Sequence, residues 1–444
     1  MPDDDSELKA RAGAVLDENW RGGYTIPSAR LYPFQWNWDA GFIAIGLAYH
    51  RPLRALEEIR SMFKAQWGTG MLPHIAFHRP DPNYFPGPEI WRTAGAPGAP
   101  AGVATSGITQ PPVFGFALER LAASPAGALP EWKAFLAEVL PQVAAFHRYL
   151  YAYRDPEGEG LVYVQHNWEV GTDNSPTWDG ILASIRSDRF RDVAALRKDV
   201  QRVAPGHRPP NEHYERYIYL VDLFADLHYD DRAIAARSPF LVQDVLFNSL
   251  LVRANLGLLR LARTVGLAFP DLEENNARTV DAIHRKLWDP VRRFYFAYDL
   301  RGRRLIPVKT SSGLMPLLAG ICPPERVLAL AEHLEKSFVA DATWRLCPST
   351  AADEAAFEPL RYWRGPVWVN LNWMLYHGLR KQGCDALAAR VKADTLGLIR
   401  EHGMYEYFDP RPATGGGAPP GLGADRFSWT AALCLDWLAN PDPL

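Results

Sequence analysis

The sequence predicts an all-α fold, an (α/α)6 toroid of helical hairpins with long loops forming a site at one end. Three observations predict it. Apolar residues recur with helical spacing in paired segments, long Gly- and Pro-rich loops separate these pairs, and aromatic and acidic side chains are concentrated in the loops. The 444 residues show no repeat of fixed period and no shift in composition, so we expect one domain, residues 1–444.

Helical periodicity and breaker residues place the elements along the chain. Pro52 separates the first hairpin into two helices, and Arg301-Gly302 predicts the turn of a small β-hairpin over 294–308. The predicted helices are 6–19, 40–49, 53–66, 114–122, 131–151, 177–186, 190–203, 213–228, 241–265, 272–287, 311–319, 324–336, 366–382, 384–401 and 427–439.

Composition limits the classes of function. A hydrophobic content of 48% supports a large core, and a net charge of −3 without a polybasic run argues against nucleic-acid and membrane partners. No His, Cys or carboxylate spacing suits a transition metal, so no metal or cofactor is expected, while calcium and a homo-oligomer stay open. The acidic N-terminus lacks an apolar run, and the four cysteines (Cys322, Cys347, Cys384 and Cys434) form no CxxC pair. We expect reduced core cysteines and a cytoplasmic protein.

The stretch 166–176, HNWEVGTDNSP, holds two carboxylates, Glu169 and Asp173. Gly171 predicts a tight turn, Ser175 a helix cap and Pro176 the first helical position. A carboxylate ahead of a helix and beside a Trp is a candidate acid whose pKa its surroundings can tune. A capped helix start with surface acids is the alternative interpretation of the same pattern.

Two further motifs combine aromatic rings with polar groups at loop-to-helix junctions. They are 32–39, YPFQWNWD, and 361–370, RYWRGPVWVN. Sugars present apolar C–H faces and a hydroxyl rim, so their sites pair Trp or Tyr rings with carboxylates and amides. For the first motif, the alternative is a helix capped by Asp39 with its tryptophans packed in the core.

Glu406 lies between two tyrosines in 404–410, MYEYFDP, ahead of a Gly-rich loop and of 427–430, FSWT. The glycines 415–417 do not follow a strand, which argues against a phosphate-binding loop. We expect the loops at about 79–110 and 409–426 to be mobile lids over the site. Gln110, held extended before two prolines, is a weaker candidate for an inward-facing amide.

Together these motifs resemble glycoside hydrolase family 63. The residues that carry the resemblance are WNWD at 36–39, GTDNSP at 171–176, YWRGPVW at 362–368, and YEYFDP at 405–410 followed by FSWT. It extends from about residue 20 to 440, and the short chain is most similar to the bacterial members that hydrolyse mannosylglycerate and glucosylglycerate. Many relatives have Glu-Ser-Gly where this chain has Glu-Val-Gly, so Val170 removes a hydroxyl near the expected site.

The resemblance implies an inverting α-glycosidase acting on a small anionic glycoside, with Asp173 as general acid and Glu406 as general base. The sugar-ring pocket is matched by Tyr32, Trp36, Asn37, Trp38, Asp39, Gly171, Tyr362 and Trp363. The surroundings of the aglycone are matched by Tyr84, Gln110, Arg208, Tyr214 and Trp368. We expect Arg208 to hold the glycerate carboxylate, because its planar fork suits that group. The alternative is a solvated arginine in a polar loop.

Other functions remain open on the same fold. A sugar epimerase would need histidines for proton transfer, and only His166 adjoins a motif. A non-catalytic carbohydrate-binding protein would keep the tryptophans without needing both acids. A trehalase-like or oligosaccharide α-glucosidase is the nearest enzyme alternative.

Overall fold

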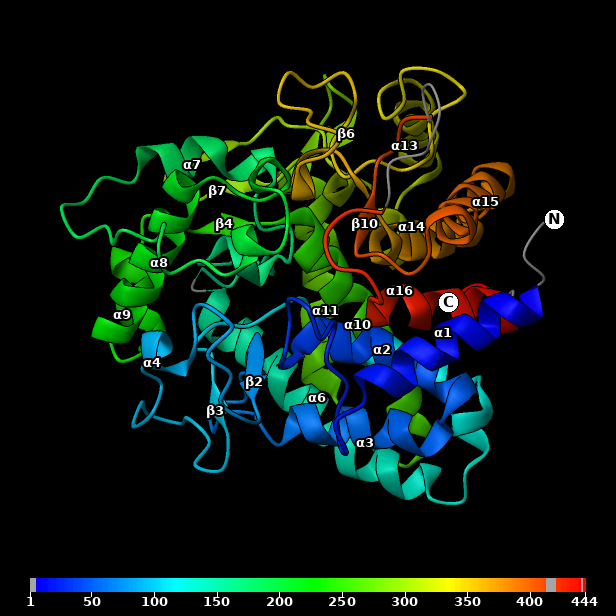
Figure 1. Cartoon of the computed structure of the whole chain (residues 1–444), viewed down its shortest axis with the longest axis horizontal. Coiled ribbons are helices and arrows are strands. Elements are labelled where there is room, and N and C mark those ends of the chain that lie inside the picture. The colour runs from blue at the N-terminus through cyan, green and yellow to red at the C-terminus, as the bar shows by residue number, and fades with distance from the viewer. Residues whose placement is uncertain (1–4, 156, 413–420, 441) are drawn as a thin grey trace.

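The computed structural model describes residues 5–155, 157–412, 421–440 and 442–444, which are mostly helical (Figure 1). The α-helices are α1 (Asp5–Asn19), α2 (Asn37–His50), α3 (Pro52–Phe63), α4 (Pro88–Trp91), α5 (Phe114–Ala122), α6 (Trp132–Arg154), α7 (Asp179–Ser184), α8 (Asn211–Asp226), α9 (Asp231–Arg237), α10 (Val245–Thr264), α11 (Pro270–Ala282), α12 (Pro316–Ala319), α13 (Pro324–Lys336), α14 (Val369–Lys381), α15 (Asp385–His402) and α16 (Ser428–Ala439).

Short strands pair near the ends of the helices. They are β1 (Gln35–Trp36), β2 (Ile75–Phe77), β3 (Ala104–Thr105), β4 (Val242–Gln243), β5 (Trp288–Asp289), β6 (Phe294–Tyr295), β7 (Tyr298–Asp299), β8 (Arg304–Leu305), β9 (Val367–Trp368) and β10 (Tyr407–Phe408). They form antiparallel sheets in the orders β1-β2-β3, β4-β7-β8, β5-β6 and β9-β10. The strands β1, β4 and β9 lead almost directly into α2, α10 and α14, so each sheet fixes where a long helix begins.

Helix α2 is buried on all sides, because its sequence is apolar around the whole helix rather than on one stripe. It packs against α3, α5 and α16. Gly46 allows the close approach to α16, since a Cβ at this position would overlap the backbone of Ala432. In Figure 1, α16 (red) lies beside α1 and α2 (blue), so the first and last helices of the described chain pack against each other.

Contacts between the inner helices follow a cyclic order. Helix α2 packs against α5, α5 against α10, α10 against α12, α12 against α14, α14 against α16, and α16 against α2. A second set lies outside this series: α3 packs on α2, α6 and α11 on α10, α15 on α14, and α1 on α16. The outer helix α3 is amphipathic, with Leu56 and Ile59 buried and Leu53 exposed.

Most of the helices predicted from the sequence are present, and the helix predicted at 114–122 has the same bounds as α5. The helix predicted over 190–203 is wrong: this segment contains turns and only the short 3-10 helix η4 (Asp199–Gln201). Its side chains bond to other loops instead, since buried Arg197 donates to the backbone oxygen of Pro209 and to Asn211 Oδ1. Helix α9 was not predicted.

The four cysteines, all among the described residues, are not paired. Cys322, Cys347 and Cys434 are free and buried, as predicted, and Cys384 is free and partly exposed.

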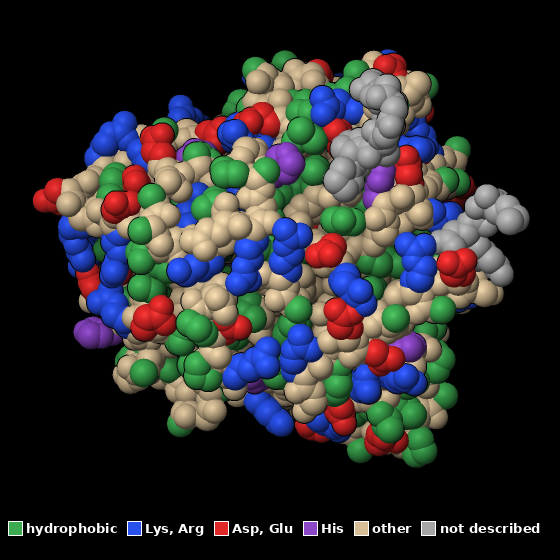
Figure 2. Space-filling view, viewed as in Figure 1, with side chains coloured by type: hydrophobic (Ala, Val, Ile, Leu, Met, Phe, Trp, Pro, Cys, Tyr) green, Lys and Arg blue, Asp and Glu red, His purple; other side chains and the backbone are tan. Residues whose placement is uncertain are grey.

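One helix and one face of the molecule bear on membrane and nucleic-acid binding. In the described part of the chain, Val245–Thr264 alone is long and apolar enough to cross a membrane, and 89% of that window is buried inside the protein, as a core helix is. On the face shown in Figure 2, basic and acidic side chains are interspersed.

Candidate active site

A cavity of about 800 Å³ opens where α2 and α16 begin. Its wall combines aromatic rings with four carboxylates and three Lys or Arg side chains. The lining residues are Pro27, Leu31, Tyr32, Trp36, Trp38, Asp39, His74, Asn83, Tyr84, Phe85, Gln110, Trp168, Gly171, Asp173, Lys198, Asp199, Arg202, Arg208, Tyr214, Tyr362, Trp363, Glu406, Phe427 and Trp429. All but two of the site residues expected from the sequence are therefore in one place.

The loop that carries Asp173 turns as predicted. The short 3-10 helix η2 (Asn167–Glu169) ends before Gly171, whose φ of 80° is a conformation that favours glycine. Asn167 Nδ2 and the Tyr217 hydroxyl donate to the backbone oxygen of Asp173 at 2.7 and 3.1 Å. After it, Ser175 caps the 3-10 helix η3 (Pro176–Trp178). The backbone of Asp173 is thus fixed, and its carboxyl group faces the cavity.

The environment of Asp173 favours its protonated form. Burial raises the pKa of Asp173 to about 8, and the charge of Arg208 opposes this rise while that of Glu406 adds to it. Asp173 is partly exposed, but its exposure is to the cavity it lines, so burial remains the dominant cause. At neutral pH this carboxyl group can donate a proton.

Glu406 lies directly before β10 and is almost fully buried, at 1% exposure. Its Oε1 accepts a hydrogen bond from the Tyr32 hydroxyl at 2.7 Å, and its Oε2 accepts one from the backbone N–H of Ala424 at 3.0 Å. Burial raises the pKa of Glu406, whereas Arg208 and these two donors lower it. Among the described residues, no side chain donates a hydrogen bond to the carboxyl group of Asp173 that would lower its pKa, so the two acids occupy different environments.

Arg208 connects several parts of this wall. Its Nε donates to Asp199 Oδ2 at 2.9 Å and its Nη1 to the Tyr32 hydroxyl at 3.0 Å. Its guanidinium lies over the ring of Tyr362, 4.0 Å from the ring centre, and its Nη1 lies 4.0 Å from Glu406 Oε1. Arg208 is therefore a buried, multiply bonded cation and not the solvated arginine of the alternative interpretation.

Asp39 is a third acid of the wall, in the first turn of α2. Burial raises its pKa well above the ordinary value, and the charge of Glu406 adds to the rise. The rings of Trp36 and Tyr84 pack edge to face, with their centres 5.3 Å apart, and those of Trp38 and Trp429 pack in the same way, with centres 5.5 Å apart. These rings and carboxylates offer the apolar faces and hydrogen-bonding groups that a sugar ring requires.

Two expected binding residues lie behind the cavity instead of lining it. Asn37 donates to the backbone oxygens of Leu72 and Pro73, which ties α2 to the segment before β2. Trp368 stacks on Trp363, with ring centres 3.5 Å apart, and donates its indole N–H to the backbone oxygen of Tyr362. In this structure both residues support the residues of the wall, and their direct contact with the substrate stays a prediction. Val170 is also fully buried, so its lost hydroxyl is not part of the wall.

Several wall residues were not predicted. Lys198, Asp199 and Arg202 belong to the segment wrongly predicted as a helix, and no motif marks them. Their role in the wall depends on the loop crossing the cavity, which sequence periodicity does not reveal. His74 was also missed, and burial lowers its pKa well below the ordinary value. By contrast, Trp168, Phe427 and Trp429 lie inside motifs that were recognised.

The closure of both expected lids stays a prediction, and the structure describes the two loops to different extents. Asn83, Tyr84, Phe85 and Gln110 bring the loop at 79–110 into the cavity wall. Of the second loop, residues 413–420 lie outside the described residues, and its closure stays a prediction. No group of three or more His, Cys, Asp or Glu side chains in the described ranges has the arrangement of a metal site.

Two acids in unlike environments, facing one cavity lined by aromatic rings, are the arrangement of a glycoside hydrolase site. Residues 32–430 match the family model described as the mannosylglycerate hydrolase MGH1-like glycoside hydrolase domain. The chain therefore belongs to this family of glycoside hydrolases.

Individual relatives agree with this assignment. A mannosylglycerate hydrolase of Rubrobacter radiotolerans is 42% identical, over 97% of this chain and 96% of its own. A glucosylglycerate hydrolase of Mycolicibacterium hassiacum is 34% identical, over 99% and 100%. The crystal structure of the family 63 mannosylglycerate hydrolase from Thermus thermophilus with Tris and D-glycerate superposes with a TM-score of 0.89, at 42% identity over 97% of this chain and 99% of that one.

Proposed function

We propose that the protein is an inverting α-glycosidase that hydrolyses 2-O-α-D-mannosyl-D-glycerate, 2-O-α-D-glucosyl-D-glycerate or both to the free hexose and D-glycerate. The observation that carries the proposal is the meeting of Asp173 and Glu406 in one aromatic-lined cavity. The similarity to mannosylglycerate and glucosylglycerate hydrolases over nearly the whole chain supports the substrate class.

In the proposed mechanism, the neutral carboxyl group of Asp173 gives its proton to the glycosidic oxygen as the bond from that oxygen to the anomeric carbon breaks. Glu406 takes a proton from a water whose oxygen attacks the anomeric carbon from the opposite face. The products are glycerate and a hexose of inverted configuration. The raised pKa of Asp173 supports its role as the proton donor. The pKa of Glu406 is also raised by burial, but the charge of Arg208 and the hydrogen bonds from Tyr32 and Ala424 oppose that rise and favour the ionised form that a base needs.

The aglycone carboxylate needs a cation in a cavity that already holds four acids. Arg208 is the buried cation of the wall, and we propose that it binds this carboxylate. Tyr84, Gln110 and Tyr214 would then surround the glycerate. Asp199 holds one edge of the guanidinium, which supports the role by fixing the direction of the remaining N–H groups.

For the architecture that carries this site, we propose an (α/α)6 toroid. The cyclic order of contacts through α2, α5, α10, α12, α14 and α16 supports an inner ring of six helices, and the helices packed outside it support an outer ring. The cavity at the beginnings of α2 and α16 fits a site at one end of such a ring.

A direct test is to incubate the purified protein with mannosylglycerate, glucosylglycerate and trehalose and to measure the released hexose. Proton NMR of the first product identifies its anomer. We expect release from at least one glycerate glycoside, with the β-anomer appearing first. Release from trehalose alone would contradict the substrate class, and an α-anomer appearing first would contradict the assignment of Glu406 as base.

A further inference from the structure

Glu169 is the second carboxylate of the Asp173 loop, yet it does not line the cavity. It is fully buried and accepts three hydrogen bonds. Arg154 Nη1 donates to its Oε2 at 3.0 Å and the backbone N–H of Gln165 to the same atom at 2.7 Å. The backbone N–H of Thr109 donates to its Oε1 at 3.2 Å. All three partners are donors, so only a carboxylate satisfies them together.

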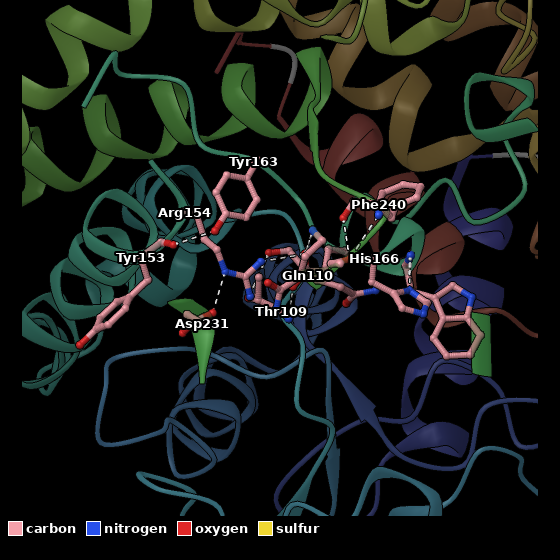
Figure 3. Close-up of polar contacts among 12 residues, drawn as sticks. Thr109, Gln110, Tyr153, Arg154, Tyr163, His166, Asp231 and Phe240 are labelled. Atoms are coloured by element: carbon pink, nitrogen blue, oxygen red, sulfur yellow. Dashed lines mark hydrogen bonds and ion pairs between the residues drawn. The ribbon is translucent and has the colours of Figure 1, made fainter. Parts of the chain in front are cut away.

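Arg154 anchors this carboxylate to the helical frame. It is the last residue of α6 and is 1% exposed. Its Nε donates to Asp231 Oδ1 at 3.0 Å at the start of α9, and its Nη2 donates to the Tyr149 hydroxyl at 3.0 Å. Figure 3 shows Arg154 lying between Asp231 and the Thr109–Gln110 segment. The guanidinium therefore connects two helices to the loops around the cavity.

The segments that meet at Glu169 both continue into the cavity wall. Thr109 precedes Gln110, whose Oε1 accepts a hydrogen bond from the backbone N–H of Trp38 at 3.2 Å. On the other side, Glu169 is followed by Gly171 and Asp173 on the same short turn. A shift of Glu169 would therefore move the acid relative to the wall that holds the substrate.

Stability alone does not account for such a pair. Desolvating two charges costs nearly as much as their attraction returns, and apolar side chains of similar volume are often as stable in such places. What the ion pair provides in addition is a fixed geometry, because three donors converge on one carboxylate from three segments of the chain.

We propose that Glu169, held by Arg154, is a positioning residue that fixes the carboxyl group of Asp173 against the substrate. The inference rests on the proposed role of Asp173 as general acid. Glu169 does not touch the substrate and acts only through the loop that it pins. Its loss should therefore weaken proton donation more than substrate binding.

The test compares two substrates that depend differently on the acid. A glycerate glycoside needs its leaving oxygen protonated, whereas an α-glycosyl fluoride of the same sugar has a leaving group that needs much less help. In Glu169→Gln, an amide N–H₂ must face one of the three donors, so the loop is displaced. We expect kcat on the glycoside to fall about 10- to 100-fold, as for small misplacements of catalytic groups, with a smaller fall on the fluoride and little change in KM.

A matched control is Asp436→Asn, which breaks another buried ion pair. Asp436 is fully buried, is bonded by Arg120 at 2.7 Å and does not line the cavity. We expect it to lower the melting temperature while leaving the ratio of glycoside to fluoride turnover unchanged. Asp173→Asn removes the proposed acid itself, so it should give the largest change in the ratio of glycoside to fluoride turnover.

If Glu169→Gln fails to fold, as circular dichroism would reveal, Arg154→Lys keeps the cation and is measured in the same way. Equal losses on glycoside and fluoride, or an unchanged kcat, would overturn the positioning role in either variant. Turnover of the glycoside by the wild type tests the proposed function separately. The positioning role is tested by how much more each variant loses on that glycoside than on the fluoride, relative to the wild type.

Discussion

Arg208 Nη1 lies 4.0 Å from Glu406 Oε1, and both side chains are at most 5% exposed. The guanidinium of Arg208 is thus itself the proposed anchor for the aglycone, and it also lies next to the proposed base. Its charge lowers the pKa of Glu406, which opposes the effect of burial. Binding of an anionic aglycone and the ionisation of the base are consequently linked through one residue.

Replacing Arg208 by Ala should therefore have two effects. Loss of a charge-assisted pair should cost about 1.5–3 kcal/mol of binding for the glycerate glycoside and little for the neutral glycerol analogue. Because Glu406 must be ionised, the acid limb of the rate profile should also move to higher pH on both substrates. Steady-state kinetics across pH measure both effects, with Arg208→Lys as the control that keeps the charge. An equal loss of binding on the two substrates would show that Arg208 does not bind the carboxylate.

Removing either proposed catalytic acid should nearly abolish hydrolysis. We expect Asp173→Asn and Glu406→Gln each to lower kcat about 10²–10⁴-fold, the usual contribution of a general acid or base. Circular dichroism should show an intact fold. A variant that keeps near wild-type turnover would exclude its residue from the mechanism.

Activity on the glycoside should fall as pH rises through about 8. Asp173 is active when protonated, and its pKa is raised to about 8, so the active form is lost above that pH. A plot of kcat/KM between about pH 5 and 10, run alongside the glycosyl fluoride, measures this limb. We expect the limb to be weaker on the fluoride. A profile that stays flat across that whole range would contradict the role of Asp173.

Gly171 should not tolerate a side chain. Its φ is 80°, and a Cβ would lie so close to the nearest ring atom of Trp38 in the cavity wall that the two would overlap. Gly171→Ala should lower kcat/KM about 100-fold, because both Trp38 and Asp173 must shift. Gly266→Ala is the matched control, since its φ is 74° and nothing lies within 4 Å of the added atom. Both variants should lose stability through the backbone, and only Gly171→Ala should lose activity. Equal activities would show that the contact with Trp38 does not matter.

The site could be predicted to a large extent because its residues lie in recognisable motifs. Asp173 and Glu406, with the rings around Trp38 and Tyr362, were expected and line the cavity. Asp199 was not expected, because its segment was predicted as part of a helix over 190–203. Its place in the wall depends on the bond to Arg208, which forms only in the folded loop. The cytoplasmic location and the absence of nucleic-acid and membrane partners stay predictions, and a homo-oligomer stays open.

The sequence by itself determined where the main helices lie and which loops carry acids and aromatic rings. Helical periodicity and turn residues are local properties, so α5 and the turn at Gly171 followed from short stretches of chain. The tertiary structure decided which acid faces the substrate. Glu169 and Asp173 lie on one short loop, yet one pairs with Arg154 in the core and the other lines the cavity. It also joined Tyr32 to Glu406 across 374 residues. Such partners are set by the packing of distant helices, which a local pattern does not encode.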